Sequence, residues 1–197
     1  MNGAPITSCR NLAALGLLLS LLGLVVSGSA QVSAIPASLQ AELLAKLETY
    51  DRSFQARAGK AARVFILVKT GSARSELSAN EMKSALRRIE HIGGLPHEEV
   101  VVPYASATAL AERIRNERVA IVFIAADLDD AIASIVTALT GASVLTVGAA
   151  PSYVARGIVL GFELESGRPR IVIHLEQARR QGVDFSSNVL RLMRVQR

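Results

Sequence analysis

Cysteine and tryptophan are the scarcest residues of this chain. Its 197 residues include one cysteine, Cys9, and no tryptophan, and aromatic residues make up 4% of the sequence. Cys9 lies before an apolar run near the N-terminus, whereas lipid attachment needs a cysteine after such a run, so the sequence does not predict a lipoprotein. If the leader is removed, no cysteine remains, which excludes disulfide bonds and thiol-based redox control in the mature chain.

Signatures of catalysis and of cofactor binding are also missing. The chain has no glycine-rich phosphate loop and no Gly-x-Ser-x-Gly nucleophile elbow. Residues 69–71 (Lys-Thr-Gly) match a triplet of penicillin-binding enzymes, but the Ser-x-x-Lys pair that those enzymes need is absent from the sequence. His91, His97 and His174 are too dispersed to predict a metal site. We therefore predict a protein that is not an enzyme and that has no cofactor and no bound metal.

The longest apolar run covers residues 12–26. It has about 15 residues, fewer than the roughly 20 that a bilayer-spanning helix needs. A basic residue precedes it and the small residues 28–30 (Gly-Ser-Ala) follow it, which is the composition of a signal peptide. We predict that residues 1–30 are a signal peptide, with cleavage after Ala34 as the alternative, and that residues 31–197 form one exported domain. A retained N-terminal anchor is the competing interpretation.

The charge of the chain is mildly basic. Its formal net charge is +5, and the Lys and Arg residues are scattered rather than gathered in one stripe. Scattered basic residues and predicted export together argue against nucleic acid as a partner. The charge serves solubility, or it favours contact with an anionic membrane surface or with an acidic face of a partner.

Strand-like and helix-like segments alternate through the middle of the chain. Short apolar runs at 63–69, 99–103, 119–125 and 144–148 are typical of strands that are buried on both faces. The segments between them carry apolar residues every three or four positions, as amphipathic helices do, and Ser106 is placed to cap one of these helices. This alternation predicts an α/β fold of three αβα layers with a mostly parallel sheet.

The C-terminal part breaks the alternation. Two strand-like runs, 158–164 and 170–175, are separated by the segment ESGRP. Glycine and proline favour a turn and proline cannot continue a central strand, so we predict an antiparallel hairpin at one edge of the sheet. A last helix, capped near residue 186, is expected to include Met193.

An amphipathic helix is predicted over residues 36–57, where apolar residues recur at helical spacing and end with Tyr50 and Phe54. This stripe either packs wholly against the sheet or leaves Tyr50 and Phe54 free to bind a partner protein. Together with the region of the C-terminal hairpin, the helix is the expected docking surface.

A candidate ligand site lies in the loop 149–157, after the fourth predicted strand. Parallel α/β sheets bind ligands beyond the carboxyl ends of their strands. Tyr153 offers a ring for stacking and a hydroxyl for hydrogen bonding, and Arg156 offers a charge for an anion. His174 is a third candidate, because the strand period turns it away from its apolar neighbours. The alternative is that Tyr153 packs on the core while Arg156 and His174 are solvated.

Five C-terminal segments follow one another in a recognisable order. They are VLTVG, an aromatic-containing loop that ends in ARG, a hairpin with glycine at its turn, ARRQG, and SSNVLRLMRV. This order resembles that of the YfiR family of exported bacterial proteins, closely over the last quarter of the chain and more loosely before it. The resemblance implies a non-enzymatic periplasmic protein that represses an inner-membrane diguanylate cyclase and so lowers cyclic di-GMP. It also implies homodimers.

Two functions are therefore in competition. The first is a periplasmic regulator that binds and represses the periplasmic part of a membrane-bound signalling protein, a diguanylate cyclase or a sensor kinase. Its release would need a signal, such as a small molecule, that binds the two states differently. The second is a periplasmic small-molecule-binding protein without a cyclase partner, which uses Tyr153, Arg156 and His174.

Overall fold

The computed structural model of this chain describes Met1 and residues 35–196. The predicted signal peptide and both of its cleavage positions lie outside these described residues, apart from Met1. Within residues 35–196, no helix is both long enough and apolar enough to cross a membrane.

Seven strands form one sheet. They are β1 (Ala62–Val68), β2 (His97–Pro103), β3 (Val119–Ile124), β4 (Leu145–Gly148), β5 (Leu160–Glu165), β6 (Arg168–His174) and β7 (Arg194–Gln196). Their order is β2-β1-β3-β4-β5-β6-β7. The pairings among β1 to β5 are parallel, β5 and β6 form an antiparallel hairpin, and β7 runs parallel to β6. The predicted mostly parallel α/β sheet with a C-terminal hairpin is confirmed.

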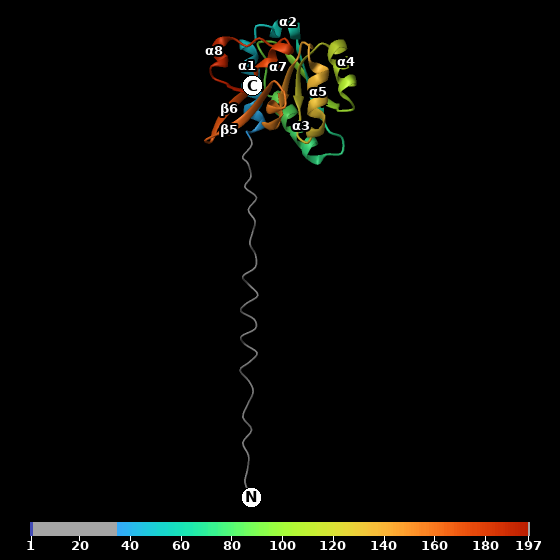
Figure 1. Cartoon of the computed structure of the whole chain (residues 1–197), viewed down its shortest axis with the longest axis vertical. Helices are drawn as coiled ribbons and strands as arrows, with labels where there is room; N and C mark the ends of the chain where they lie inside the picture. Colours follow the sequence, from blue (N-terminus) through green and yellow to red (C-terminus); the bar gives the residue numbers. More distant parts are fainter. Residues whose placement is uncertain (2–34, 197) are drawn as a thin grey trace. The chain divides into compact units, whose positions relative to one another are not determined.

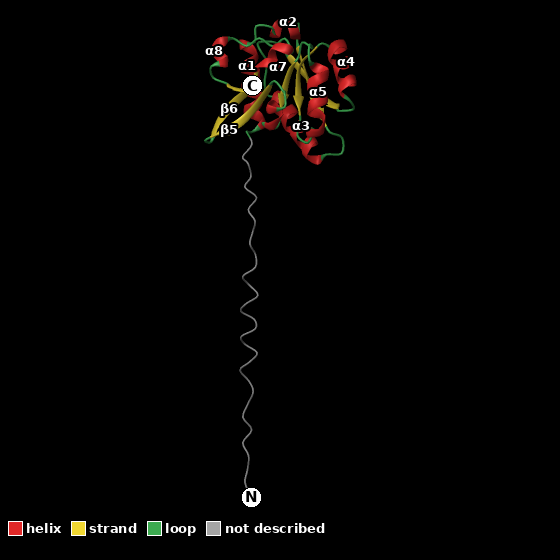
Figure 2. Ribbon diagram, in the orientation of Figure 1, coloured by secondary structure: helices red, strands yellow, loops and turns green. Residues whose placement is uncertain are grey.

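Helices cover both faces of the sheet (Figures 1 and 2). They are α1 (Ala37–Leu47), α2 (Phe54–Ala58), α3 (Ala73–Leu86), α4 (Ala107–Glu117), α5 (Ile132–Leu139), α6 (Ser152–Ala155), α7 (Leu175–Arg180) and α8 (Ser187–Leu190), with 3-10 turns η1 (Glu48–Tyr50) and η2 (Asp129–Ala131). Ser106 caps α4, because its hydroxyl accepts a hydrogen bond from the Ala109 N–H, as predicted.

The alternation of side chains along β1 shows how the two cores arise. Val64 and Ile66 belong to the core beneath α1 and α3, whereas Phe65 and Leu67 belong to the core beneath α4 and α5. A strand whose successive residues all enter a core must be apolar throughout, which explains the continuous run that the sequence shows.

The end of the chain differs from the prediction. The last helix stops at Leu190, and Met193 lies outside it although its side chain is buried. The next residues pair with β6 as β7, in the register Val172 with Arg194. This pairing occupies backbone groups of the hairpin that would otherwise lie open at the edge of the sheet, which competes with continuing the helix.

The first helix is also shorter than predicted. Instead of running to residue 57, it ends at Leu47, continues as η1, and is interrupted at Asp51, whose backbone is extended. The Asp51 carboxylate accepts a hydrogen bond of 2.9 Å from the Ser53 N–H, two residues ahead. Short polar side chains that bind the nearby backbone in this way compete with helix formation.

Candidate protein-docking groove

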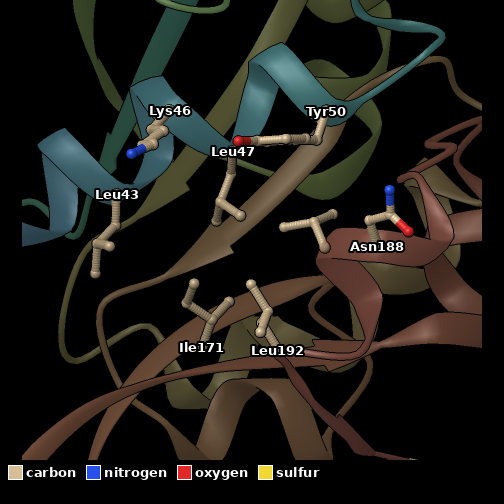
Figure 3. Close-up of a pocket in the computed structure, with 8 residues that line it drawn as sticks. Leu43, Lys46, Leu47, Tyr50, Ile171, Asn188 and Leu192 are labelled. Atoms are coloured by element: carbon tan, nitrogen blue, oxygen red, sulfur yellow. The ribbon is translucent and has the colours of Figure 1, made fainter.

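An open apolar groove lies between the first helical segment and the C-terminal part of the chain (Figure 3). Its volume is about 360 Å³. We call it the docking groove; it is lined by Leu43, Lys46, Leu47, Tyr50, Ile171, Asn188, Val189 and Leu192. Figure 3 shows Leu43, Leu47 and Tyr50 on the wall formed by α1 and η1, and Ile171 and Leu192 across the space from them. The two regions that the sequence predicted as a docking surface thus meet in one place.

Two walls of the docking groove expose large apolar side chains. Tyr50 is 41% exposed and Leu192 is 67% exposed, whereas Leu47 and Val189, which line the same groove, are buried. Val195 on β7 and Leu164 on β5 are also exposed. Apolar side chains gathered at a surface favour contact with another molecule, because that contact removes their area from water.

Phe54 does not belong to this surface. Its side chain is 1% exposed and lies in the core beneath α1 and α3. The break at Asp51 turns α2 away from the line of α1, so that Tyr50 and Phe54 no longer share one stripe. Of the two residues predicted to bind a partner, the structure leaves only Tyr50 accessible.

Backbone hydrogen bonds join the two walls at one end of the docking groove. The Ser186 N–H donates to the Tyr50 carbonyl at 2.9 Å, and the Arg52 N–H donates to the Asp184 carbonyl at 2.9 Å. The Asp184 N–H in turn donates to the Asp51 carboxylate at 3.0 Å. Since α8 begins directly after Ser186, the position of the α8 wall depends on this junction.

A buried ionic cluster lies behind the junction. The Arg57 Nη2 group donates to Glu48 Oε2 at 2.9 Å and to Asp51 Oδ2 at 2.6 Å, and the Arg57 Nε–H donates to the Ala120 carbonyl at 3.1 Å. All three charged side chains are at most 1% exposed. We call Glu48, Asp51 and Arg57 the ionic cluster.

The two carboxyl groups of the ionic cluster titrate differently. Burial raises the pKa of Glu48 to about 8, although Arg57 opposes this shift, and the negative charge of Asp51 adds to it. Burial also acts to raise the pKa of Asp51, but the charge of Arg57 and hydrogen bonds from Ser53 hold it below its ordinary value. The sequence offered no signal for this cluster, because the same residue types occur on solvated helix faces.

The predicted ligand-site residues Tyr153 and Arg156 converge on Asp129. Tyr153 is fully buried; its hydroxyl accepts a hydrogen bond of 3.0 Å from the Leu128 N–H and donates to Asp129 Oδ2 at 3.3 Å. Burial raises the pKa of Tyr153 to about 12. The hydrogen bond from the Leu128 N–H lowers this pKa, and the negative charge of Asp129 raises it further. Arg156 donates to the Asp129 carbonyl at 2.7 Å. These contacts hold the loop between β3 and α5 in place.

His174 has a local role. Its Nδ1 atom accepts a hydrogen bond of 3.2 Å from the Gln177 N–H and so caps α7. No hydrogen bond or ion pair joins His174 to Tyr153 or Arg156 in the part of the chain that the structure describes. The structure therefore brings Tyr153 and Arg156 together without His174, and it closes the Tyr153 ring off from solvent.

Tyr153→Phe is expected to lower the free energy of unfolding by about 1–2 kcal/mol, because the buried Leu128 N–H then loses its acceptor. Chemical denaturation with urea measures this. The matched control is Tyr104→Phe, which removes a hydroxyl that bonds Ser134 at the surface and should change stability by less than about 0.5 kcal/mol. Equal effects of the two variants would show that the Tyr153 hydroxyl is not a structural anchor.

Metal ligands are not clustered: among the described residues, no three His, Cys, Asp or Glu side chains are placed to hold an ion.

Comparison with known proteins gives a family and a fold. A sequence profile described as YfiR/HmsC-like matches residues 37–194. No curated protein matches the chain by sequence. Among solved structures, a conserved domain protein from Vibrio cholerae matches with a TM-score of 0.58 at 16% identity, over 84% of this chain and 62% of that one.

Two further solved structures are similar. The ABC domain from Streptococcus pneumoniae in complex with L-Trp has a TM-score of 0.57 at 15% identity, over 82% of this chain and 62% of its own. A substrate-binding protein with adhesive properties from Clostridium difficile, in a ligand-free, open form, has a TM-score of 0.53 at 11% identity, over 74% of this chain and 57% of its own. This chain spans about three fifths of the length of these structures, and at such low identity the likeness shows the fold alone.

Proposed function

Because this chain belongs to the YfiR/HmsC-like family, we propose that it is a periplasmic regulator that binds and represses the periplasmic part of an inner-membrane diguanylate cyclase. The observation that supports docking is the groove itself, where Tyr50 and Leu192 remain exposed on a mostly apolar surface. In this proposal the protein acts by contact and catalyses no reaction. Homodimer formation, which the family resemblance implies, stays a prediction.

Charge at the rim of the docking groove suggests the kind of segment that it holds. Lys46 lines the groove and forms no ion pair with another described residue. We infer that the occupant is a segment of the cyclase that presents apolar side chains to the apolar lining of the groove and a carboxylate to Lys46, because charges of opposite sign steer association and set its orientation.

Leu192→Asp is expected to weaken binding of the cyclase periplasmic domain at least about tenfold, because it places a charge in the apolar centre of the contact. Calorimetry with the purified domain of a cyclase encoded beside this protein measures the affinity. Leu77→Asp is the matched control: Leu77 is 60% exposed on α3, outside the docking groove, and its replacement should leave the affinity unchanged.

Two results would contradict the proposal. If wild-type protein binds none of the adjacent cyclase or sensor-kinase domains, the regulator function is wrong. If Leu192→Asp and Leu77→Asp bind equally well, docking occurs on another surface. A large thermal shift with one small molecule, and no protein partner, would favour the alternative of a small-molecule-binding protein.

A further inference from the structure

The walls of the docking groove meet over the ionic cluster. This cluster contains two carboxyl groups, and its single cation, Arg57, can neutralise only one of them. We propose that Glu48 is a proton-linked control on the docking groove, so that loss of its proton repositions η1 and α8 and changes the surface offered to a partner. The regulatory meaning rests on the proposed docking function, but the structural change is tested below without any partner.

The geometry of the ionic cluster sets the charge problem. Glu48 and Asp51 bind the same Nη2 nitrogen of Arg57, at 2.9 and 2.6 Å. With both carboxyl groups ionised, one guanidinium faces two negative charges, and the cluster keeps a net negative charge away from water. Buried charge without compensation is strongly unfavourable. A single proton on one carboxyl group makes the cluster neutral.

The hydrogen bonds identify Glu48 as the group that takes the proton. Asp51 Oδ1 accepts from the Ser53 N–H at 2.9 Å, from the Ser53 hydroxyl at 2.7 Å and from the Asp184 N–H at 3.0 Å, and these donors stabilise an ionised carboxylate. Glu48 Oε2 has only Arg57, and Glu48 Oε1 has no hydrogen-bond partner among the described residues. The pKa of Glu48, raised to about 8 by burial, agrees with this assignment.

Other charged groups near the cluster are directed elsewhere. Arg118 donates to the Ala56 and Arg57 carbonyls at the end of α2. Arg52 pairs with Asp184 at the surface, and His91, in the segment that leads to Gly93 beside Glu48, faces Glu90. Arg57 and Asp51 are therefore the charges that Glu48 meets directly.

Short covalent and hydrogen-bonded links connect Glu48 to both walls of the groove. Glu48 begins η1, and Tyr50, which ends it, carries its ring into the docking groove (Figure 3). The Tyr50 carbonyl accepts from the Ser186 N–H, one residue before α8. The Arg52 N–H donates to the Asp184 carbonyl at 2.9 Å, which ties the same junction to the segment that leads into α8. A shift of ionised Glu48 toward water must therefore move η1 and pull on α8.

Ring signals of tyrosine report this shift directly. The chain has three tyrosines, of which Tyr50 lines the docking groove, Tyr104 lies at a distant surface and Tyr153 is buried. In wild-type protein labelled with ¹³C in the tyrosine rings, we expect the Tyr50 signal to move with a midpoint near pH 8, below the range of about 10 where tyrosine itself ionises. The Tyr104 and Tyr153 signals should stay in place.

Variants separate Glu48 from other groups. Glu48→Gln cannot ionise and should abolish the movement of the Tyr50 signal, whereas Glu42→Gln, on the exposed side of α1, should retain it. A wild-type Tyr50 signal that does not move over this range overturns the proposal, and this measurement needs no variant to fold. The proposal is also overturned if the Tyr50 signal of Glu48→Gln still moves as it does in wild type, or if the signals of all three tyrosines shift together. If the Tyr50 signal moves with the ionisation of Glu48 in a protein that binds no cyclase, the proton-linked change is supported and the docking function is overturned.

Discussion

Arg57→Met is expected to destabilise the protein by about 3–5 kcal/mol, the range found when one partner of a buried ion pair is removed. The variant leaves Glu48 and Asp51 side by side without a cation, and it removes the bond from Arg57 Nε–H to the Ala120 carbonyl on β3. Methionine fills much of the space of the arginine stem, so the loss reports on charge more than on packing. Urea unfolding with an unchanged m-value measures the difference.

A surface arginine provides the control for this variant. Arg52 pairs with Asp184 at 3.5 Å, and both side chains are well exposed, so Arg52→Met should change stability by less than about 1 kcal/mol. Adding Glu48→Gln to Arg57→Met should recover part of the loss, because glutamine needs no proton on folding, whereas Glu48 is ionised in the unfolded chain at neutral pH and must be protonated to be buried. If Arg57→Met and Arg52→Met have equal effects, the ionic cluster does not stabilise the fold.

The free energy of unfolding is expected to fall as the pH rises from about 4.5 to about 8. The pKa of Glu48 is raised from its ordinary value of 4.5 to about 8, so the folded state holds a proton that the unfolded chain has released. The contribution of Glu48 is complete below the unfolded value and is lost as the pH passes through the folded value. For a shift of this size, the loss amounts to several kcal/mol.

Asp51 acts in the opposite sense and in another range. Its folded pKa lies below the ordinary value of 3.8, so the stability that it contributes is present above that value and is lost only in stronger acid. Urea unfolding at a series of pH values should therefore give a slope between about 4.5 and about 8 that Glu48→Gln removes and Glu42→Gln retains. A wild-type slope that persists in Glu48→Gln would assign the pH dependence to another group.

Local physical rules accounted for the sheet and for several of its connections. The run 119–125 is apolar at every position, which a strand covered on both faces requires, and β3 is buried along its whole length. Ser106 caps α4 because a hydroxyl at that position meets the free N–H groups of the first turn whatever the rest of the fold does. The turn with Gly167 similarly depends on a backbone conformation, φ +75°, that glycine adopts without strain.

The contacts of the candidate ligand-site residues could not be predicted from local rules. Tyr153 and Arg156 do follow a parallel strand, as predicted, but the Tyr153 hydroxyl and the Arg156 guanidinium bind Asp129, which lies 24 and 27 residues away in the chain. The position of a residue on a strand or loop predicts where its backbone lies, but it does not predict which group its side chain binds. His174 likewise turned out to cap α7.

What the residues alone specified is the order of strands and helices and the likeness to a known family, because both follow from composition and spacing along the chain. The docking groove and the ionic cluster depended on the folded molecule. A helical period of 3.6 counted Tyr50 and Phe54 as neighbours, whereas the chain leaves the helix between them at Asp51. The Asp51 carboxylate accepts from the nearby Ser53 N–H and also from the Asp184 N–H, 133 residues away. Contacts of that separation leave no periodic trace, so only folding reveals that Tyr50 faces the solvent and Phe54 the core.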